Sequence, residues 1–253
     1  MLKAVLFDIG GTLHTVQNNS TLREAFAKRL IDRLSVYDIH LDTAPELLGE
    51  MLHRNAEAYK HWSEESKAEL PPVRIWNEYY LKDFHIGEEV LSPIAEELSF
   101  LYDYARVCNK RRPYIKETVQ ALSDMGLRQG IISNIISTSF VPHILREYGI
   151  HREMECVVMS SEAGCRKPDP RIFEIAMEQL GVCAKETAYV GDTISRDVLG
   201  ARNADLRLVI QIHNPVIAHR DAHLNKEAHL PDHYIYELRE IPDIVRPLLR
   251  ADS

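Results

Sequence analysis

The sequence is poor in the residues that mark disulfide-bonded and nucleic-acid-binding proteins. Its 253 residues include four cysteines with no CxxC pair among them, so we expect reduced, mostly buried thiols. Basic side chains are outnumbered, with 30 Lys and Arg against 38 Asp and Glu, and the formal net charge is −8. This balance gives no electrostatic case for nucleic acid or an anionic membrane as a partner.

Long apolar runs are missing as well. No stretch approaches the roughly 20 residues of a membrane-spanning helix. The first apolar run, Ala4 to Phe7, is too short for a secretory signal, so we expect a cytoplasmic protein with no membrane contact. The remaining composition is that of a globular protein, with 45% hydrophobic and 27% charged residues. The length fits one large domain, or a core with a smaller second domain.

The segment Lys3 to Leu13, KAVLFDIGGTL, is typical of a buried strand that ends in a ligand-binding turn. Ala4 to Phe7 suits a strand covered on both faces. The run stops at Asp8, and Gly10 and Gly11 follow; this pair favours a turn, because glycine enters the φ > 0 region without steric cost. Open α/β sheets bind ligands at the carboxyl ends of their strands, so Asp8 is a candidate functional residue.

The next part of the chain, from Thr21 to about Tyr104, has apolar residues at helical spacing and no strand signal. Glu24 lies three places after Thr21, which marks Thr21 as a possible N-cap. The polar segment His14 to Ser20, just before it, is expected to be a loop. The pattern predicts four helices, over Thr21–Tyr37, Thr43–Trp62, Val73–Phe84 and Gly87–Tyr104.

Beyond Pro113 short apolar strands alternate with helices. Helices are expected over 114–125 and 170–180, and strands over 130–133, 156–159, 187–190, 206–212 and 234–236. Alternation of this kind predicts βαβ units. The fold class is therefore α/β, a doubly wound, mostly parallel, Rossmann-like sheet with an inserted all-helical cap domain. We place the core in residues 1–16 and 107–253 and the cap in residues 17–106.

Polar residues stand at the ends of several of these strands, where chemistry is expected. They are Asp8, Ser133, Asn134, Asp192 and, five residues further on, Asp197. Three acids that converge on one point raise one another's pKa unless a cation neutralises them. Carboxylate oxygens are ligands that Mg²⁺ prefers. Lys167 and the hydroxyl of Ser133, near the same point, would hold phosphate oxygens.

Four short motifs make the chain resemble the haloacid dehalogenase (HAD) superfamily, in its subgroup with a helical cap after the first strand. The motifs are Asp8-Ile9-Gly10-Gly11-Thr12-Leu13, Ser133, Lys167 and Gly191-Asp192-x4-Asp197. One motif alone is a weak signal, but four in this order over an α/β pattern are highly specific. The resemblance covers nearly the whole chain and implies a Mg²⁺-dependent phosphatase with a small phosphorylated metabolite as its substrate.

The resemblance also implies a nucleophile and a metal site. Asp8 would attack phosphorus and form an aspartyl-phosphate, which water then hydrolyses. The ligands of Mg²⁺ would be the backbone carbonyl of Gly10 and the carboxylates of Asp8, Asp192 and Asp197, the last either directly or through water.

Substrate-binding roles follow from the same resemblance. Ser133 and Lys167 would bind the transferring phosphoryl group and balance its charge. Gly11, Thr12 and Asn134 complete the predicted substrate-binding set. The cap would close over the site, exclude water and select the substrate.

Gly10 departs from the family pattern. Phosphatases of this family normally carry an Asp at this position, where it protonates the leaving group and then activates water. Positioned acid–base catalysis typically contributes about 10²–10⁴-fold. Its loss weighs most on alkyl phosphates, so we expect weak activity or a preference for good leaving groups. His14 is a possible substitute donor, although an exposed loop histidine is the expected reading.

Two other functions stay open. A phosphonatase-like hydrolase has a small residue at the position of Gly10 and uses a cap lysine as a Schiff base; Lys60, Lys67 and Lys82 are candidates, each expected to be a surface lysine. A phosphate-binding or regulatory protein without turnover is the other. The metal-independent dehalogenase branch is disfavoured, because this chain keeps the GDxxxxD motif. Five histidines between His213 and His233 include an i, i+4 pair, His219 and His223, but a solvated segment is expected there.

Overall fold

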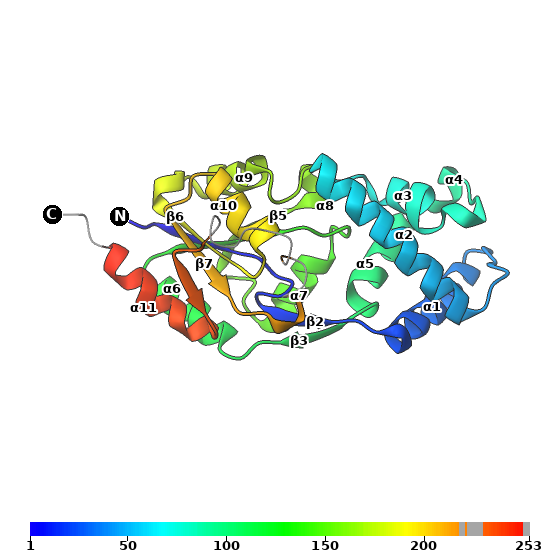
Figure 1. Ribbon diagram of the computed structural model, residues 1–253, viewed down its shortest axis with the longest axis horizontal. Helices are drawn as coiled ribbons and strands as arrows, with labels where there is room; N and C mark the ends of the chain where they lie inside the picture. Colours follow the sequence, from blue (N-terminus) through cyan, green and yellow to red (C-terminus); the bar gives the residue numbers. More distant parts are fainter. Residues whose placement is uncertain (218–220, 222–229, 250–253) are drawn as a thin grey trace.

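The computed structural model describes residues 1–217, 221 and 230–249. Figure 1 shows an elongated molecule in which helices α1 to α5 gather at one end and the sheet, with both termini, lies at the other. We call residues 20–105 the helical half and the rest the α/β half.

The α/β half is built on a six-stranded parallel sheet in the order β5-β4-β1-β6-β7-β8. β1 lies between β4 and β6, with Ala4 paired to Arg128 on one side and to Thr187 on the other. The strands are β1 (Ala4–Phe7), β4 (Arg128–Ser133), β5 (Met154–Met159), β6 (Thr187–Gly191), β7 (Leu208–Ile212) and β8 (His233–Ile235). The predicted α/β class with a parallel sheet is confirmed.

Helices cover both faces of this sheet. Side chains alternate between the two faces along each strand, so the apolar residues of β1 need a covering layer on each side. Val5 and Phe7 pack with α6 (Ile115–Asp124), α7 (Phe140–Tyr148) and α11 (Ile241–Val245). Leu6 packs on the other face with α9 (Pro170–Leu180) and α10 (Leu199–Asn203). The remaining short helices of this half are α8 (Ser160–Ala163), η3 (Ala184–Glu186), η4 (Ile194–Val198), η5 (Pro215–Ile217), η7 (Leu238–Glu240) and η8 (Arg246–Leu249).

The helical half has a hydrophobic core of its own, built around the buried side chains of Trp76 and Tyr59. Its elements are α1 (Ser20–Ser35), α2 (Pro45–Ser66), α3 (Pro72–Ile75), η1 (Trp76–Tyr80), η2 (Lys82–Phe84), α4 (Glu88–Leu91) and α5 (Ala95–Ala105). No helix in the described part of the chain is long and apolar enough to cross a membrane.

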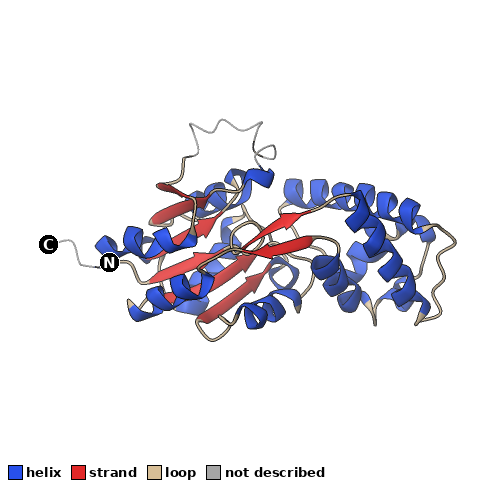
Figure 2. Ribbon diagram, turned by 90° about the horizontal axis from the view of Figure 1, so that it is seen from below, coloured by secondary structure: helices blue, strands red, loops and turns tan. Residues whose placement is uncertain are grey.

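A two-stranded antiparallel ribbon joins the halves, visible in Figure 2 between the sheet and the helices. It consists of β2 (His14–Gln17), which leads into the helical half, and β3 (Cys108–Arg111), which leads out of it. The prediction of a loop over His14 to Ser20 is therefore wrong for its first four residues. These residues gain their order from a partner strand some ninety residues away, which a local pattern does not reveal.

Two expectations within the helical half are also corrected. The side chain of Asn19, not Thr21, caps α1, accepting a hydrogen bond of 2.9 Å from the backbone N–H of Leu22. The expected helix over Gly87–Tyr104 is two helices, α4 and α5, separated by a turn that contains Pro93, which has no N–H to continue the first helix. The predicted boundaries of a cap domain, 17–106, stay a prediction.

Candidate active site

The carboxyl ends of β1, β4 and β6 meet at one cavity between the two halves, with a volume of about 270 Å³. Polar residues directly follow each of these strands. Because the strands are parallel and in register, these residues lie at the same edge of the sheet. The predicted site residues that line the cavity are Asp8, Gly10, Gly11, Ser133, Asn134 and Asp192. Thr12, Lys167 and Asp197 do not line it but are buried beside these residues.

Asp8 accepts hydrogen bonds from two other predicted site residues, Lys167 and Thr12. Its Oδ1 accepts a hydrogen bond of 2.7 Å from Nζ of Lys167, and its Oδ2 accepts one of 3.0 Å from the hydroxyl of Thr12. Burial raises the pKa of Asp8 and Lys167 opposes that shift, while the charge of Asp197 adds to it. The net shift is upward, and the ammonium group is the main influence that opposes it.

Lys167 lies at the centre of a buried polar cluster. Its Nζ donates to Asp8 Oδ1 and Asp197 Oδ1, both at 2.7 Å, to the hydroxyl of Tyr189 at 2.8 Å and to the carbonyl of Ile132 at 3.1 Å. Burial lowers the pKa of Lys167, but the two carboxylates outweigh it and the net shift is upward. The lysine is therefore a fixed positive charge beside Asp8.

Asp197 has every carboxylate oxygen occupied by protein donors. Oδ1 accepts from Lys167 and from the Tyr189 hydroxyl at 2.9 Å, and Oδ2 accepts from the backbone N–H and the hydroxyl of Thr193 at 3.0 and 2.5 Å. Burial alone would raise the pKa of Asp197, but Lys167 and Arg196 hold it below its usual value. This carboxylate is arranged to orient Lys167.

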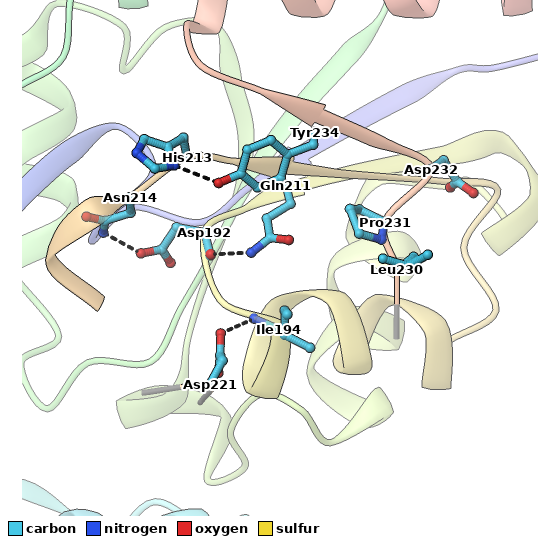
Figure 3. A pocket seen from close by; sticks show the side chains of 10 residues that line it. All are labelled: Asp192, Ile194, Gln211, His213, Asn214, Asp221, Leu230, Pro231, Asp232 and Tyr234. Carbon is cyan, nitrogen blue, oxygen red and sulfur yellow. Dashed lines mark hydrogen bonds between the residues drawn. The ribbon is translucent and has the colours of Figure 1, made fainter. Parts of the chain in front are cut away.

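Within the described part of the chain, Asp192 uses only one of its carboxylate oxygens in hydrogen bonds. Its Oδ2 accepts 2.7 Å from the amide of Asn214, and its backbone carbonyl accepts 2.9 Å from Gln211, as Figure 3 shows. Oδ1 is buried and has no hydrogen-bond partner among the described residues. Burial and the charges of Asp197 and Asp8 raise the pKa of Asp192 to about 8.

These carboxylates meet the requirements of a cation site. One oxygen from each of Asp8, Asp192 and Asp197 lies within 4.8 Å of the others, and all three residues are buried. The unpaired Oδ1 of Asp192 is a buried acceptor that costs free energy unless a cation or donor reaches it. The donor set is all oxygen, which suits Mg²⁺.

The two glycines after Asp8 have different surroundings. Gly11 has φ of +101°, and a Cβ there would lie 1.8 Å from Oδ2 of Asp192, so only glycine fits. A Cβ at Gly10 would meet only Cγ2 of Val16, at 3.9 Å, and Gly10 also lines the cavity. The backbone at Gly10 therefore accepts a side chain.

Two arginines of the cavity wall were not anticipated from the sequence. Arg106 follows α5 and Arg196 lies in η4, and in both the Nε is buried without a hydrogen-bond partner among the described residues. The guanidinium of Arg106 lies 4.4 Å from the ring centre of Tyr102. Arg106 lies outside all four motifs, and Arg196 occupies the last variable position of Gly191-Asp192-x4-Asp197, so the motifs specify neither side chain.

His14 is buried, so the expectation of an exposed loop histidine is wrong. Its side chain lines the cavity, and its Nδ1 lies 2.9 Å from the hydroxyl of Tyr148 on α7. Burial and the nearby charge of Arg112 lower the pKa of His14 to about 4, so the ring is neutral at pH 7. The cause is the ribbon, which turns this residue inward.

Asn134 links two of the motif segments. Its Oδ1 accepts 2.9 Å from the backbone N–H of Lys167, and its Nδ2 donates 3.0 Å to the backbone carbonyl of the same residue. Ser133, one residue earlier, is buried and lines the cavity. The segments after β4 and before α9 are thereby held together.

Other candidates lie away from this cavity. Lys60, Lys67 and Lys82 are not among the residues that line it. A second cavity, of about 560 Å³ and shown in Figure 3, lies on another side of Asp192 and lacks Asp8 and Ser133. His219 and His223 lie outside the described residues.

Comparison with known proteins agrees with this geometry. Residues 2–205 match the family model of haloacid dehalogenase-like hydrolases. The chain belongs to the haloacid dehalogenase-like hydrolase family. It is therefore a hydrolase, as predicted from its four motifs.

Relatives of this hydrolase extend over nearly its whole length. A protein of Methanopyrus kandleri named glyceraldehyde 3-phosphate phosphatase is 27% identical over 250 residues, covering 99% of this chain and 100% of the relative. One of the same name from Methanothermobacter thermautotrophicus is 29% identical over 228 residues, or 89% and 92% of the two chains. The solved structure of a 2-haloacid dehalogenase from Pseudomonas syringae superposes with a TM-score of 0.66 at 22% identity, covering 98% of this chain and 100% of that one. That likeness concerns the fold alone.

Proposed function

We propose that this hydrolase is a Mg²⁺-dependent phosphatase of small phosphorylated metabolites that acts through an aspartyl-phosphate on Asp8. The observation that carries the proposal is the buried Asp8 carboxylate, held between Lys167 and Thr12 at the edge of a cavity that also contains the unpaired oxygen of Asp192. A nucleophile, a fixed positive charge and an oxygen-rich cation site are what phosphoryl transfer needs.

We assign the metal to Asp8, Asp192 and the carbonyl of Gly10. Mg²⁺ bound there would neutralise the acids and the charge that develops on the phosphoryl oxygens. Asp197 would contribute at most through water, because both of its oxygens already accept hydrogen bonds from Lys167, Tyr189 and Thr193.

The protein's own residues would then carry two displacements. A carboxylate oxygen of Asp8 forms a bond to phosphorus as the bond from phosphorus to the leaving oxygen breaks, and water later releases phosphate and restores Asp8. Ser133 and Lys167 hold the phosphoryl oxygens, and Gly11, Thr12 and Asn134 shape the turns around them. Gly10 supplies no proton, so the leaving group departs as an anion unless another group protonates it.

The substrate would be small. A cavity of about 270 Å³ is at or below the lower end of the usual range of ligand pockets, roughly 300–1,000 Å³. Relatives of similar length are named for a triose phosphate, so we infer a phosphorylated compound of about that size. Arg106 and Arg196 in the cavity wall favour an anionic substrate. The helical half would act as a cap that covers the cavity, with residues 17–106 as its extent.

Steady-state hydrolysis tests the proposal. With Mg²⁺ the protein should hydrolyse p-nitrophenyl phosphate and acetyl phosphate, and EDTA should stop it. Asp8→Asn should lower kcat by at least about 10³-fold, because the variant has no carboxylate nucleophile. Asp124→Asn, on the surface of α6, is the matched control and should behave as the wild type. Equal turnover by Asp8→Asn would exclude the mechanism.

A panel of phosphates graded by the pKa of the leaving group tests the missing proton donor. Without protonation the leaving group carries a full negative charge, so kcat/KM should fall steeply as its pKa rises. Acyl and aryl phosphates should therefore be much better substrates than alkyl phosphates. A flat dependence would mean that another residue supplies the proton.

A further inference from the structure

One carboxylate of the helical half is fully buried against the α/β half. Glu69, between α2 and α3, has a side chain that is 0% exposed. Nη1 of Arg166 lies 3.1 and 3.0 Å from its two oxygens, and the hydroxyl of Ser160 lies 2.5 Å from Oε2. The hydroxyl of Tyr59, from α2, donates to Oε1.

Main-chain bonds fix the same contact. The backbone N–H of Glu69 donates 3.1 Å to the carbonyl of Gly164, and that of Arg166 donates 3.0 Å to the carbonyl of Lys67. Ala68 and Cys165 form an antiparallel bridge between these bonds. The segment 67–69 therefore lies directly beside the segment that precedes Lys167.

Both side-chain partners of Glu69 in the α/β half lead to phosphoryl-binding groups. Arg166 is next to Lys167, whose backbone N–H donates to Asn134 Oδ1. The hydroxyl of Ser160 accepts 2.9 Å from the backbone N–H of Ile135, which follows Asn134. One buried carboxylate is thus connected to the segments that carry Ser133 and Lys167.

We infer that Glu69 is a positioning residue, which holds Lys167 and Ser133 in register with Asp8; this rests on the proposed phosphatase function. A buried ion pair adds little net stability, because desolvation offsets its attraction, but its hydrogen bonds are directional. The pair of Glu69 with Arg166 orients two segments from different parts of the chain. It also ties the helical half to the phosphoryl-binding groups at a point far in sequence from the ribbon.

Glu96 provides a matched comparison. It lies on α5 and also binds the α/β half, accepting from the backbone N–H groups of Thr138 and Ser139 at 3.0 Å and from the Ser139 hydroxyl at 2.7 Å. In the described part of the chain, these partners precede α7 and form no hydrogen bond with Lys167 or Ser160. Glu96→Gln therefore also removes one carboxylate charge at the contact between the helical half and the α/β half.

Amide hydrogen exchange tests whether Glu69 holds the segments of Ser133 and Lys167, and it does not depend on enzymatic activity. In Glu69→Gln the amides of Ile135 and Lys167 should exchange about 10-fold faster than in the wild type, because their acceptors are no longer held. In Glu96→Gln faster exchange should be confined to residues 137–140. The inference is overturned if Glu69→Gln leaves residues 135 and 167 unchanged, or if Glu96→Gln affects them equally.

Steady-state kinetics test whether the loss of Glu69 slows catalysis. Glu69→Gln should lower kcat on p-nitrophenyl phosphate about 10-fold with KM within about twofold, since the contacts of Lys167 and Ser133 strengthen in the transition state. Glu96→Gln should keep kcat within about twofold at a temperature where both variants are folded by circular dichroism. An unchanged kcat in folded Glu69→Gln would refute the positioning role.

Where Glu69→Gln does not fold, Arg166→Gln removes the other member of the pair and should give the same faster exchange and the same loss of kcat. Where both single variants fold, they can be combined. If the pair acts as a unit, the double variant should be no slower than the slower single variant, whereas independent roles would multiply the two losses. If the wild-type protein hydrolyses no phosphate ester or acyl phosphate, the proposed function is refuted. Hydrogen exchange alone would then show whether Glu69 holds the segments of Ser133 and Lys167 in place.

Discussion

Gly10 lies in the cavity wall at a position with room for a side chain. It lines the cavity beside Asp8, and its backbone leaves space for a Cβ, with Val16 the nearest contact at 3.9 Å. Its neighbour Gly11 has no such space, because a Cβ would collide with Asp192. Packing therefore does not exclude an acidic side chain at residue 10.

Gly10→Asp should raise kcat/KM on alkyl phosphates by about 10²-fold or more, because a positioned acid typically contributes about 10²–10⁴-fold. Gly10→Asn has the same shape without the proton and should give no such gain. Rates on acetyl phosphate, whose leaving group needs no proton, should change little in both. Equal rates on alkyl phosphates for the two variants would show that the carboxyl does not act as an acid.

At this scale the motif residues were predictable, and the rest of the cavity was not. Asp8 and Asp192 end buried strands, and their spacing from glycines marks them. His14, Arg106 and Arg196 reach the cavity only because distant elements pack together. His14 directly follows the first motif and Arg196 directly precedes Asp197, but the motifs do not specify the side chain at either position.

At the scale of elements, the close approach of α10 to α9 determines the place of the Lys167 segment. A Cβ added at Gly200 would lie 2.6 Å from Cε2 of Phe173 and 3.1 Å from Cα of Pro168. Pro168 follows Lys167 directly. The absence of a side chain at Gly200 thus lets the helices and this segment share one layer.

Gly200→Ala should lower the free energy of unfolding by about 1–3 kcal/mol, because overpacking forces neighbours from their places. Urea unfolding followed by circular dichroism measures this loss. Gly10→Ala, whose Cβ meets only Val16, is the control for the glycine-to-alanine change. A loss of the same size in both would mean that the contact with Phe173 is not the cause.

A second element-scale feature is the contact of α5 with the segment before α7. Oδ2 of Asp103 accepts 3.0 Å from the backbone N–H of Ser137, and burial raises the pKa of Asp103 to about 7. A raised pKa in the folded state means that folding takes up a proton between about pH 4 and 7. The contribution of Asp103 to stability is therefore lost as pH rises through that range.

Asp103→Asn keeps an acceptor for Ser137 without the charge, so it should reduce the loss of stability between pH 5 and pH 8. The upper bound on the difference is about 1.4 kcal/mol per pH unit, and we expect less because the side chain is only half-buried. Thermal unfolding at the two pH values, with Asp124→Asn as the surface control, measures it. Parallel pH profiles of variant and wild type would contradict the assignment.

Element prediction succeeded where the pattern was local. Most strands of the parallel sheet contain a short apolar run, such as Ala4–Phe7 in β1. Helix α9 begins with Pro170 and ends before Gly181, as its sequence indicates. α7 went unpredicted because Pro142 interrupts its pattern; in the structure that proline lies in the first turn, where its missing N–H is not needed. β2 went unpredicted because His14–Gln17 is polar and is ordered by pairing with β3.

At the scale of the whole molecule, the proposed Mg²⁺ site at the buried acids predicts that stability depends on the cation. Mg²⁺ at about 100 times its Kd should add about 2.7 kcal/mol to the free energy of unfolding. For a chain of this size that corresponds to a rise in Tm of roughly 5–10 °C. Calorimetry with Mg²⁺ and with EDTA measures it.

The same calorimetry on Asp192→Asn tests whether Asp192 is one of the residues that bind Mg²⁺. The variant lacks one charge and should show little rise in Tm with Mg²⁺, whereas Asp205→Asn, in an exposed ion pair with Lys185, should respond as the wild type. A full Mg²⁺ response in Asp192→Asn would place the cation elsewhere.

The central position of β1 has a consequence for synthesis of the protein. Its neighbours in the sheet come from residues 128–131 and 187–190, so the first strand made is among the last to find both partners. Closing such distant pairings is slow, and an apolar strand that waits for them is prone to aggregate. On the ribosome, Ala4–Phe7 should therefore lack one partner strand until residues 187–190 have emerged, and a chaperone that binds short apolar segments should be able to bind it during that time.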